Sequence, residues 1–294
     1  MRVTHKMIFN SFIIPLRRNQ NRLFEIEEHL IAGKRVVKPS DDPVAAARIS
    51  KLRGQLARTE QYIKNIDEGK TLLSAMETAV DGIKEALVRT QELILDKLSG
   101  AESEQDWQIA ADELDNIIES VLQHANATHE GRYLFAGFAS QSAPFDGDGN
   151  YLGRSGDEFK IEIGEGEYLR INICGDELMI TSGGINIIQM LNDFRNHVAA
   201  GDADWLRDHL SDLHDSLDHI LSNLSEIGVR YSRLEDARAA CDSISFNISV
   251  MISELEDLDE IEAAAAFNAQ KDALEAAMAA AASVLDQSFL DFLR

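Results

Sequence analysis

The 294-residue sequence is poor in cysteine, proline and aromatic residues. Its two cysteines, Cys174 and Cys241, lie far apart, one in a strand-like segment and the other in a helical one, so we expect buried thiols and no disulfide framework. The four prolines, the 6% aromatic content and the abundance of Ala, Leu, Glu and Asp favour a mainly helical protein.

Basic residues are also scarce. The sequence has 28 Lys and Arg but 51 Asp and Glu, which gives a formal net charge of -23. Nucleic acids and anionic membrane surfaces bind clustered Lys and Arg, so we expect neither partner. No apolar run approaches the roughly 18 residues of a membrane span. The N-terminus lacks the apolar core and the cleavage site of a secretory signal peptide, so we expect no cleaved signal.

The charge is unevenly distributed between the two ends of the chain. Residues 1–60 contain 12 Lys and Arg against 6 Asp and Glu, whereas residues 255–294 contain 2 against 9. The net charges of +6 and -7 are complementary, which favours docking of one end on the other. Screened surface charge contributes little to such docking, so apolar burial must supply most of it.

A short amphipathic helix is predicted before Gly33, which stands where a helix C-cap belongs. Pro39 and Pro43 then exclude a continuous helix, and Asp42 with Pro43 can cap and start the next one. Pro15 is expected to weaken the early part of this first helix, so that it becomes ordered through packing. The apolar stripe consists of Ile8, Phe12, Leu16, Leu23, Ile26 and Leu30, with Asn19 in the gap.

From Pro43 a heptad pattern continues to Leu98 without a strong stop before Ser99-Gly100, and it predicts one coiled-coil helix roughly 80 Å long. A second amphipathic helix is predicted from Ser103 to about Glu130. After Gly131 the apolar period changes to two, which indicates short strands at residues 133–135, 159–163 and 168–173 separated by Gly-rich turns.

Helix returns at residues 185–199, and a clean heptad pattern runs from Leu206 towards Leu255. The acidic run at residues 254–262 marks a second break, which mirrors the first. An Ala-rich helix then ends the chain in SFLDFLR. The apolar residues expected to pack in this last helix are Ile261, Leu274, Met278, Ala281, Leu285, Phe289, Leu290, Phe292 and Leu293.

We therefore predict a mainly α fold, an elongated nested coiled-coil helical rod with paired N- and C-terminal helices and a small inserted β-domain. Terminal helices from residues 1–42 and 255–294 form an inner assembly domain in this prediction. Residues 43–130 and 185–254 form the long-helix rod, and residues 131–184 form the β-domain. Long amphipathic helices with uncovered apolar faces indicate a self-assembling structural protein.

Catalytic and cofactor motifs are absent from the sequence, and we predict no catalytic residue, no cofactor and no metal. The loop from Asp146 to Asp157 begins like a calcium loop, but Tyr151 stands where Gly is needed, which favours an ordinary turn. Acidic and histidine residues on one helical stripe lie off the Leu heptad, which favours a solvated face over a metal-binding protein or enzyme. This stripe contains Asp208, Asp212, Asp215 and His219, with His209 and His214 nearby.

The segment AGKRVVKPSDDPVAAARIS at residues 32–50 resembles the signature of the bacterial flagellin superfamily. The residues of this segment that carry the resemblance are Gly33, Lys34, Arg35, Pro39, Ser40, Asp41, Asp42 and Pro43. GRYLFAG at residues 131–137, GVRYSRL at 228–234 and the terminal SFLDFLR are more similar to its hook-associated members than to filament flagellins. The departures are mild, since Ala32 and Val44 stand where the superfamily often has Ser and Ala, and cysteines are unusual in it.

The resemblance implies a subunit of the hook-filament junction outside the cell, exported by the flagellar type III apparatus. It implies self-assembly into a homo-oligomeric layer through the terminal helices. It also implies contact with hook-associated protein 1 on one side and flagellin on the other, and a cytoplasmic export chaperone. Filament flagellin itself remains the alternative within the superfamily, and a cytoplasmic coiled-coil scaffold would need no export.

The breaks at residues 33–43 and 254–262 would face each other in this layout and act as a hinge between the terminal helices and the rod. The basic residues Lys34, Arg35 and Lys38 are then candidates for contacts with acidic neighbours, or they belong to a solvated loop. The sequence leaves these two interpretations equally open.

Overall fold

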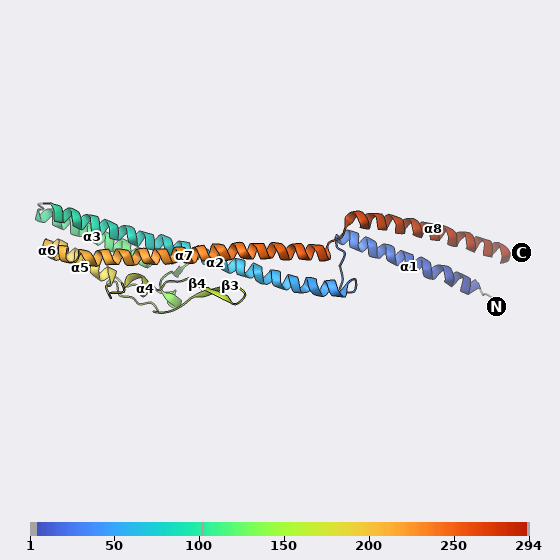
Figure 1. Ribbon diagram of the computed structural model, residues 1–294, viewed down its shortest axis with the longest axis horizontal. Helices are drawn as coiled ribbons and strands as arrows, with labels where there is room; N and C mark the ends of the chain where they lie inside the picture. The colour runs from blue at the N-terminus through green and yellow to red at the C-terminus, as the bar shows by residue number, and fades with distance from the viewer. Residues whose placement is uncertain (1–4, 101–102, 293–294) are drawn as a thin grey trace. The chain divides into compact units, whose positions relative to one another are not determined.

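The structure is a computed structural model that describes residues 5–100 and 103–292 (Figure 1). In the terminal helices it describes side chains from Asn10 to Ser283, with the exception of Phe12. The helices are α1 (His5–Ala32), α2 (Pro43–Ser99), α3 (Glu104–Ala125), α4 (Gly175–Met179), α5 (Ile187–Ala199), α6 (Ala203–Asp208), α7 (Leu210–Glu256) and α8 (Glu260–Phe292). A single 3₁₀ turn (Gly137–Ala139) and four short strands lie between α3 and α4.

Two compact units divide the chain. Unit 1 combines the residues up to Arg58 with those from Ile244 onward, and unit 2 comprises Thr59–Ser243. Helices α2 and α7 each contribute one end to unit 1 and the rest of their length to unit 2. The three-part division expected from the sequence stays a prediction.

Unit 2 is built around one hydrophobic cluster. Ile83 of α2, Leu114 of α3, Phe194 of α5 and Ile220 of α7 all have fully buried side chains in this cluster. Phe135, from the segment between α3 and α4, is equally buried in the same cluster. The inserted segment therefore shares its core with the helices of unit 2.

The strands form two separate antiparallel pairs. Strand β1 (Thr128–His129) pairs with β2 (Arg132–Tyr133), and β3 (Lys160–Gly164) pairs with β4 (Glu167–Arg170). The β1–β2 turn places Glu130 and Gly131 at φ 49° and 76°, the left-handed conformation of tight hairpin turns.

The helix boundaries at the two breaks agree with the sequence. Helix α1 runs through Pro15 and ends at Ala32, and α2 begins at Pro43 and continues to Ser99. Helix α7 ends at Glu256, inside the predicted break, and α8 begins at Glu260.

The predicted helix from Ser103 to about Glu130 is too long, because α3 ends at Ala125. Ser103 is its N-cap, and a reciprocal bond with Asp106 completes a capping box. At the other end the Asn126 side chain donates to the Phe145 carbonyl at 3.1 Å and accepts from the Phe145 amide at 3.0 Å. The inserted segment thus holds Asn126 outside the helix. This is a tertiary contact, which amphipathic spacing along the helix cannot predict.

Helix α4 is absent from the sequence prediction, and α6 is predicted only as part of the heptad helix that runs from Leu206. Both are short, with five and six residues, so neither contains enough turns to produce a periodic signal. No helix among residues 5–100 and 103–292 is both long and apolar enough to cross a membrane.

Candidate assembly site in the terminal helices and their connecting loops

The loop that carries the sequence signature begins with a Schellman motif at the end of α1. Gly33 adopts φ 63°, the Gly33 amide bonds the Leu30 carbonyl and the Lys34 amide bonds the His29 carbonyl. The predicted C-cap role of Gly33 is confirmed by this geometry. A side chain at residue 33 would strain this left-handed backbone.

This loop binds along the break between α7 and α8 within unit 1. Lys34 and Asp257 form an isolated antiparallel bridge, and the Leu258 amide donates to the Gly33 carbonyl at 3.2 Å. The Arg35 amide donates to the Glu256 carbonyl at 2.7 Å. The two breaks are therefore joined through their backbones, and we call residues 33–43 with 252–258 the clasp.

A buried carboxylate lies at the centre of the clasp. The Glu256 side chain is only 7% exposed and accepts from Lys34 Nζ at 2.6 Å and from Arg53 Nη2 at 2.7 and 2.6 Å. Burial alone would raise the pKa of Glu256, but the hydrogen bonds and positive charges of Lys34 and Arg53 outweigh it, so the pKa lies below its ordinary value. Glu256 is therefore ionised at neutral pH.

A small apolar cluster supports this ionic centre. Val36, Ala45 and Ile49 are buried there, and the half-buried Ile252 and Leu255 of α7 pack against them. The cluster joins the loop, the first turns of α2 and the last turns of α7.

The two signature aspartates organise the loop and the start of α2. Asp41 accepts from the amides of Lys38 at 2.7 Å and Val37 at 3.1 Å. Asp42 accepts from the amides of Ala45 at 2.9 Å and Val44 at 3.1 Å, which makes it the N-cap of α2. The Lys38 amide is the main cause of the lowered pKa of Asp41, and the Ala45 amide is the main cause for Asp42.

The remaining signature residues lie at the surface of the loop. Arg35 donates to the Leu255 carbonyl at 2.7 Å and lies 3.5 Å from Asp42, while Lys38 contacts Glu28 of α1 at 2.5 Å. These contacts favour the interpretation that the three basic residues bind acidic neighbours over that of a solvated loop. Pro39 and Ser40 are exposed in the loop, and Pro43 is the first residue of α2.

Helices α1 and α8 pack against each other in unit 1, where Figure 1 shows them side by side. Leu23, Ile26 and Leu30 are half-buried on one stripe of α1, as the spacing predicts. The Gln270 amide of α8 donates to the Asn19 carbonyl at 3.2 Å. The half-buried and buried positions of α8 are Ala263, Phe267, Gln270, Leu274, Ala277 and Ala281.

Met278 does not lie on that stripe, and its side chain is 47% exposed. The four-residue spacing from Leu274 predicts Met278 on the stripe, but the inward positions of α8 include Ala277, which follows Leu274 by three. Ile261 is also directed outward, with 85% exposure. The packed face of α8 contains small alanines, so the positions of the large apolar residues alone do not identify it.

Several predicted packing residues fall outside the side chains that the structure describes. Ile8, Phe12, Leu285, Phe289, Leu290 and Phe292 lie in α1 or α8 without described side chains, and Leu293 lies beyond the described residues. Their packing roles remain predictions.

Large apolar side chains also face outward in unit 1. Ile14, Phe24 and Ile31 of α1 are 61%, 56% and 81% exposed. The end of α7 exposes Ile244, Phe246, Val250 and Met251, and α2 exposes Val44. Exposed apolar side chains that lie together on a surface are typical of protein interaction sites.

The two metal-binding candidates of the sequence do not bring their ligands together. Both Asp146 oxygens are occupied within the turn, by the amides of Asp148 and Asn150 and by the Asn150 side chain. His219 lies 2.9 Å from the Glu177 carbonyl, and His214 lies 3.8 Å from Asp218. Within residues 5–100 and 103–292, no three His, Cys, Asp or Glu side chains form a group that could hold a metal ion.

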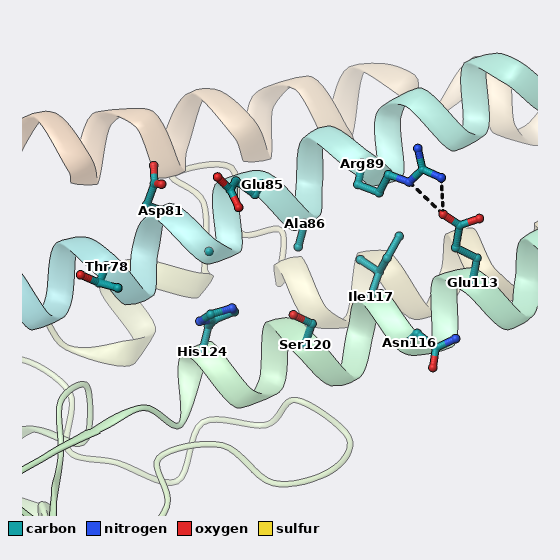
Figure 2. Close-up of a pocket in the computed structure, with 11 residues that line it drawn as sticks. Thr78, Asp81, Glu85, Ala86, Arg89, Glu113, Asn116, Ile117, Ser120 and His124 are labelled. Atoms are coloured by element: carbon teal, nitrogen blue, oxygen red, sulfur yellow. Dashed lines mark hydrogen bonds and ion pairs between the residues drawn. The ribbon is translucent and has the colours of Figure 1, made fainter.

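A groove between α2 and α3 in unit 2 contains further acidic side chains (Figure 2). Arg89 of α2 contacts Glu113 of α3 at 2.6 Å, and Asp81 pairs with Lys84. The His124 ring lies over Gly82, where a Cβ atom would come within 2.5 Å of it. Gly82 thus allows the two helices to approach, and the groove is part of their packing.

Sequence reasoning missed Arg53 and Glu256, the two residues that complete the ionic centre of the clasp. Glu256 stands in the acidic run that marked the break, but nothing in a single sequence distinguishes it from its acidic neighbours. Arg53 lies ten residues after Pro43 and looks like an ordinary surface position on α2.

Residues 3–140 match the family described as the bacterial flagellin N-terminal helical region. The chain is 26% identical to flagellar hook-associated protein 3 of Escherichia coli K12, over 94% of each chain. It is 24% identical to flagellin of Bacillus subtilis 168, over the full length of both.

Solved structures show the same fold. The flagellar junction protein FlgL of Legionella pneumophila aligns with a TM-score of 0.60 at 16% identity, covering 72% of this chain and 100% of that one. The named relatives are structural flagellar proteins, and filament flagellin is the weaker alternative among them. The resemblance to the bacterial flagellin superfamily, and most of all to its hook-associated protein 3, is therefore confirmed.

Proposed function

We propose that this chain is a structural adaptor subunit of the bacterial flagellum, which joins the hook to the filament. The observation that carries the proposal is the pairing of α1 with α8 in a unit that leaves large apolar side chains exposed. The similarity to hook-associated protein 3 over 94% of the chain supports the same function.

In this function the terminal helices pack against those of neighbouring copies and form a homo-oligomeric layer. Hook-associated protein 1 binds on one side of the layer and flagellin on the other. Exposed apolar residues such as Ile31 and Phe24 become buried in these contacts, which supplies the association energy at roughly 25 cal/mol for each Å² of apolar surface. The signature loop and its clasp hold α1 and α8 at their common base.

The proposed location is the hook-filament junction outside the cell, after export through the flagellar type III apparatus without a cleaved signal. A cytoplasmic chaperone covers the apolar C-terminal helix before export in this proposal. The exposed Met278 and Ile261 support it, since both would be unprotected in a free subunit. The predicted packing residues from Leu285 to Phe292 belong to the same helix end.

The test is an Ile31→Asp substitution in the strain that produces this protein, matched with Gln20→Asp at an exposed polar position of the same helix. Ile31→Asp is expected to leave the isolated subunit folded, as circular dichroism reports, but to abolish filament attachment and release unpolymerised flagellin into the medium. Deletion of residues 275–294 is expected to give the same result with the helices of unit 2 intact. Normal filaments with Ile31→Asp or with the deletion would contradict the proposal.

The same strains distinguish an adaptor from filament flagellin. An adaptor is needed in small amounts, so immunolabelling is expected to place it at the base of the filament only. If a strain with a second flagellin builds filaments without this protein, or if label covers the whole filament, the flagellin alternative is favoured.

A further inference from the structure

Trp205, on the short helix α6 of unit 2, lies between two imidazole rings. The His197 ring of α5 stacks on one indole face, with centroids 3.8 Å apart and planes 4° from parallel. The His209 ring, at the C-cap of α6, stacks on the other face at 3.9 Å and 16°. Phe194 packs edge-on at 5.3 Å. We call His197, Trp205 and His209 the stack.

Hydrogen bonds fix the orientation of both imidazoles. His209 Nδ1 lies 2.9 Å from the Trp205 carbonyl, and since a carbonyl only accepts, Nδ1 carries a hydrogen. His197 Nδ1 lies 3.2 Å from one oxygen of Asp202, whose other oxygen accepts from the Trp205 amide at 3.2 Å. Nε2 is therefore the nitrogen at which each ring can gain a second proton.

Protonation changes the strength of these contacts. The Trp205 amide and then the His197 ring lower the pKa of Asp202, so its carboxylate is ionised and a protonated His197 forms an ion pair with it. A cation on an indole face is attracted by the negative potential of the ring, which neutral imidazole is not. Both rings therefore bind Trp205 more strongly in their protonated form.

The charged groups on the elements around the stack add to this preference because most of them are acidic. Arg195 lies 3.0 Å from Asp115 and Arg207 lies 2.8 Å from Asp204, so these cations are paired. Helix α3 packs on α5, and α5 packs on α6. The ionisable groups on these elements and on the start of α7 include Asp106 and Asp115 of α3, Asp193 and Arg195 of α5, Asp202, Asp204, Arg207 and Asp208 in and beside α6, Asp212, His214 and Asp218 of α7, and Lys97 of α2, whose charge acts on Asp106.

We propose that the stack is a proton-responsive latch, which fastens α6 to α5 and to the start of α7 more tightly as the medium becomes acidic. Histidine is the side chain whose charge state ordinarily differs between mildly acidic and mildly basic solution, so these two conditions are the ones to compare. The segment affected runs from His197 to Asp212. The proposal stands on contacts inside unit 2 and is independent of the proposed assembly.

Hydrogen exchange of the full chain, measured by mass spectrometry at about pH 8 and about pH 5.5 and corrected for the intrinsic exchange rate, tests the latch. Amides of residues 203–212 are expected to gain about threefold protection at the acidic pH, which corresponds to a cation held against an indole at a partly exposed site. In a Trp107→Phe background, the emission of Trp205 is expected to follow the same pH transition.

The double substitution His197→Gln and His209→Gln is expected to abolish the acid-induced protection, and each single substitution to reduce it. His214→Gln is the matched control, because His214 is 63% exposed on α7 and outside the stack, and it is expected to keep the full response. Protection that is unchanged or lower at acidic pH would overturn the latch, as would a full response in the double variant.

Discussion

The two compact units bury their apolar residues to very different extents. In unit 2 a continuous cluster includes side chains from α2, α3, α5, α6, α7 and the inserted segment, and many of them are completely inaccessible. Among the described residues of unit 1, a small apolar cluster at the clasp and the start of α2 buries Val36, Ala45 and Ile49, while Phe24, Ile31 and others remain exposed. We expect from this difference that unit 2 is stable by itself, and in the proposed assembly other chains complete the surface of unit 1.

The largest effect is expected from Phe135→Ala in unit 2. Phe135 is 0% exposed, so its truncation leaves a cavity and should lower the free energy of unfolding by about 3–5 kcal/mol. Urea unfolding followed by circular dichroism measures this change. Phe24→Ala in unit 1 is the matched comparison, and because that ring is 56% exposed we expect less than about 0.5 kcal/mol.

Equal losses for these two substitutions would remove the contrast between the units. A large loss at Phe24 would mean that α1 already has a complete core in the isolated chain. A small loss at Phe135 would mean that the cluster of unit 2 adjusts to the cavity.

An intermediate effect is expected at Glu256, the centre of the clasp. Its folded-state pKa is depressed, so its stabilising contribution is present above the unfolded value of about 4.5 and is lost as the pH falls through the folded value. Glu256→Gln should weaken the clasp by about 1–2 kcal/mol at neutral pH, since Lys34 and Arg53 lose their shared anion. Hydrogen exchange of the Arg35 amide, which donates to the Glu256 carbonyl, measures the opening.

The control is Glu254→Gln, an exposed acid on the same helix and two residues away. It should leave the Arg35 amide protected at neutral pH and should keep the loss of protection in acid. If Glu256→Gln retained that acid transition in full, then Asp41 or Asp42, whose pKa values are also depressed, would control the clasp instead.

Much of this architecture was accessible from the sequence because its signals are local. Pro39, Pro43 and the aspartates between them mark a loop and a new helix, and Gly33 supplies the left-handed residue that a Schellman motif needs. Heptad spacing gave the 57-residue helix α2 almost to the residue. These features depend on residues a few positions apart.

The rest depends on contacts between distant residues. Arg53 and Glu256 are separated by 203 positions, and only the fold makes them partners. Asn126 leaves α3 because Phe145 bonds it, and Ala277 replaces Met278 on the packed face because alanine admits a neighbouring helix. The stack is equally hidden, since three aromatic rings within thirteen residues give no periodic signal.

The smallest effect is expected at the start of α2, where Asp42 satisfies the amides of Val44 and Ala45. Asp42→Ala removes this N-cap and should cost about 1 kcal/mol, seen as faster hydrogen exchange of those two amides. Asp42→Asn keeps an accepting oxygen at the same place, so it should retain most of the protection. If Asp42→Asn lost as much protection as Asp42→Ala, the hydrogen bonds of the N-cap would not be what stabilises the start of α2. The ion pair of the Asp42 carboxylate with Arg35, 3.5 Å away, would stabilise it instead. Unit 1 would then differ from unit 2 in a further respect. Its signature segment would hold the start of α2 through an ion pair, whereas unit 2 is held together by apolar burial.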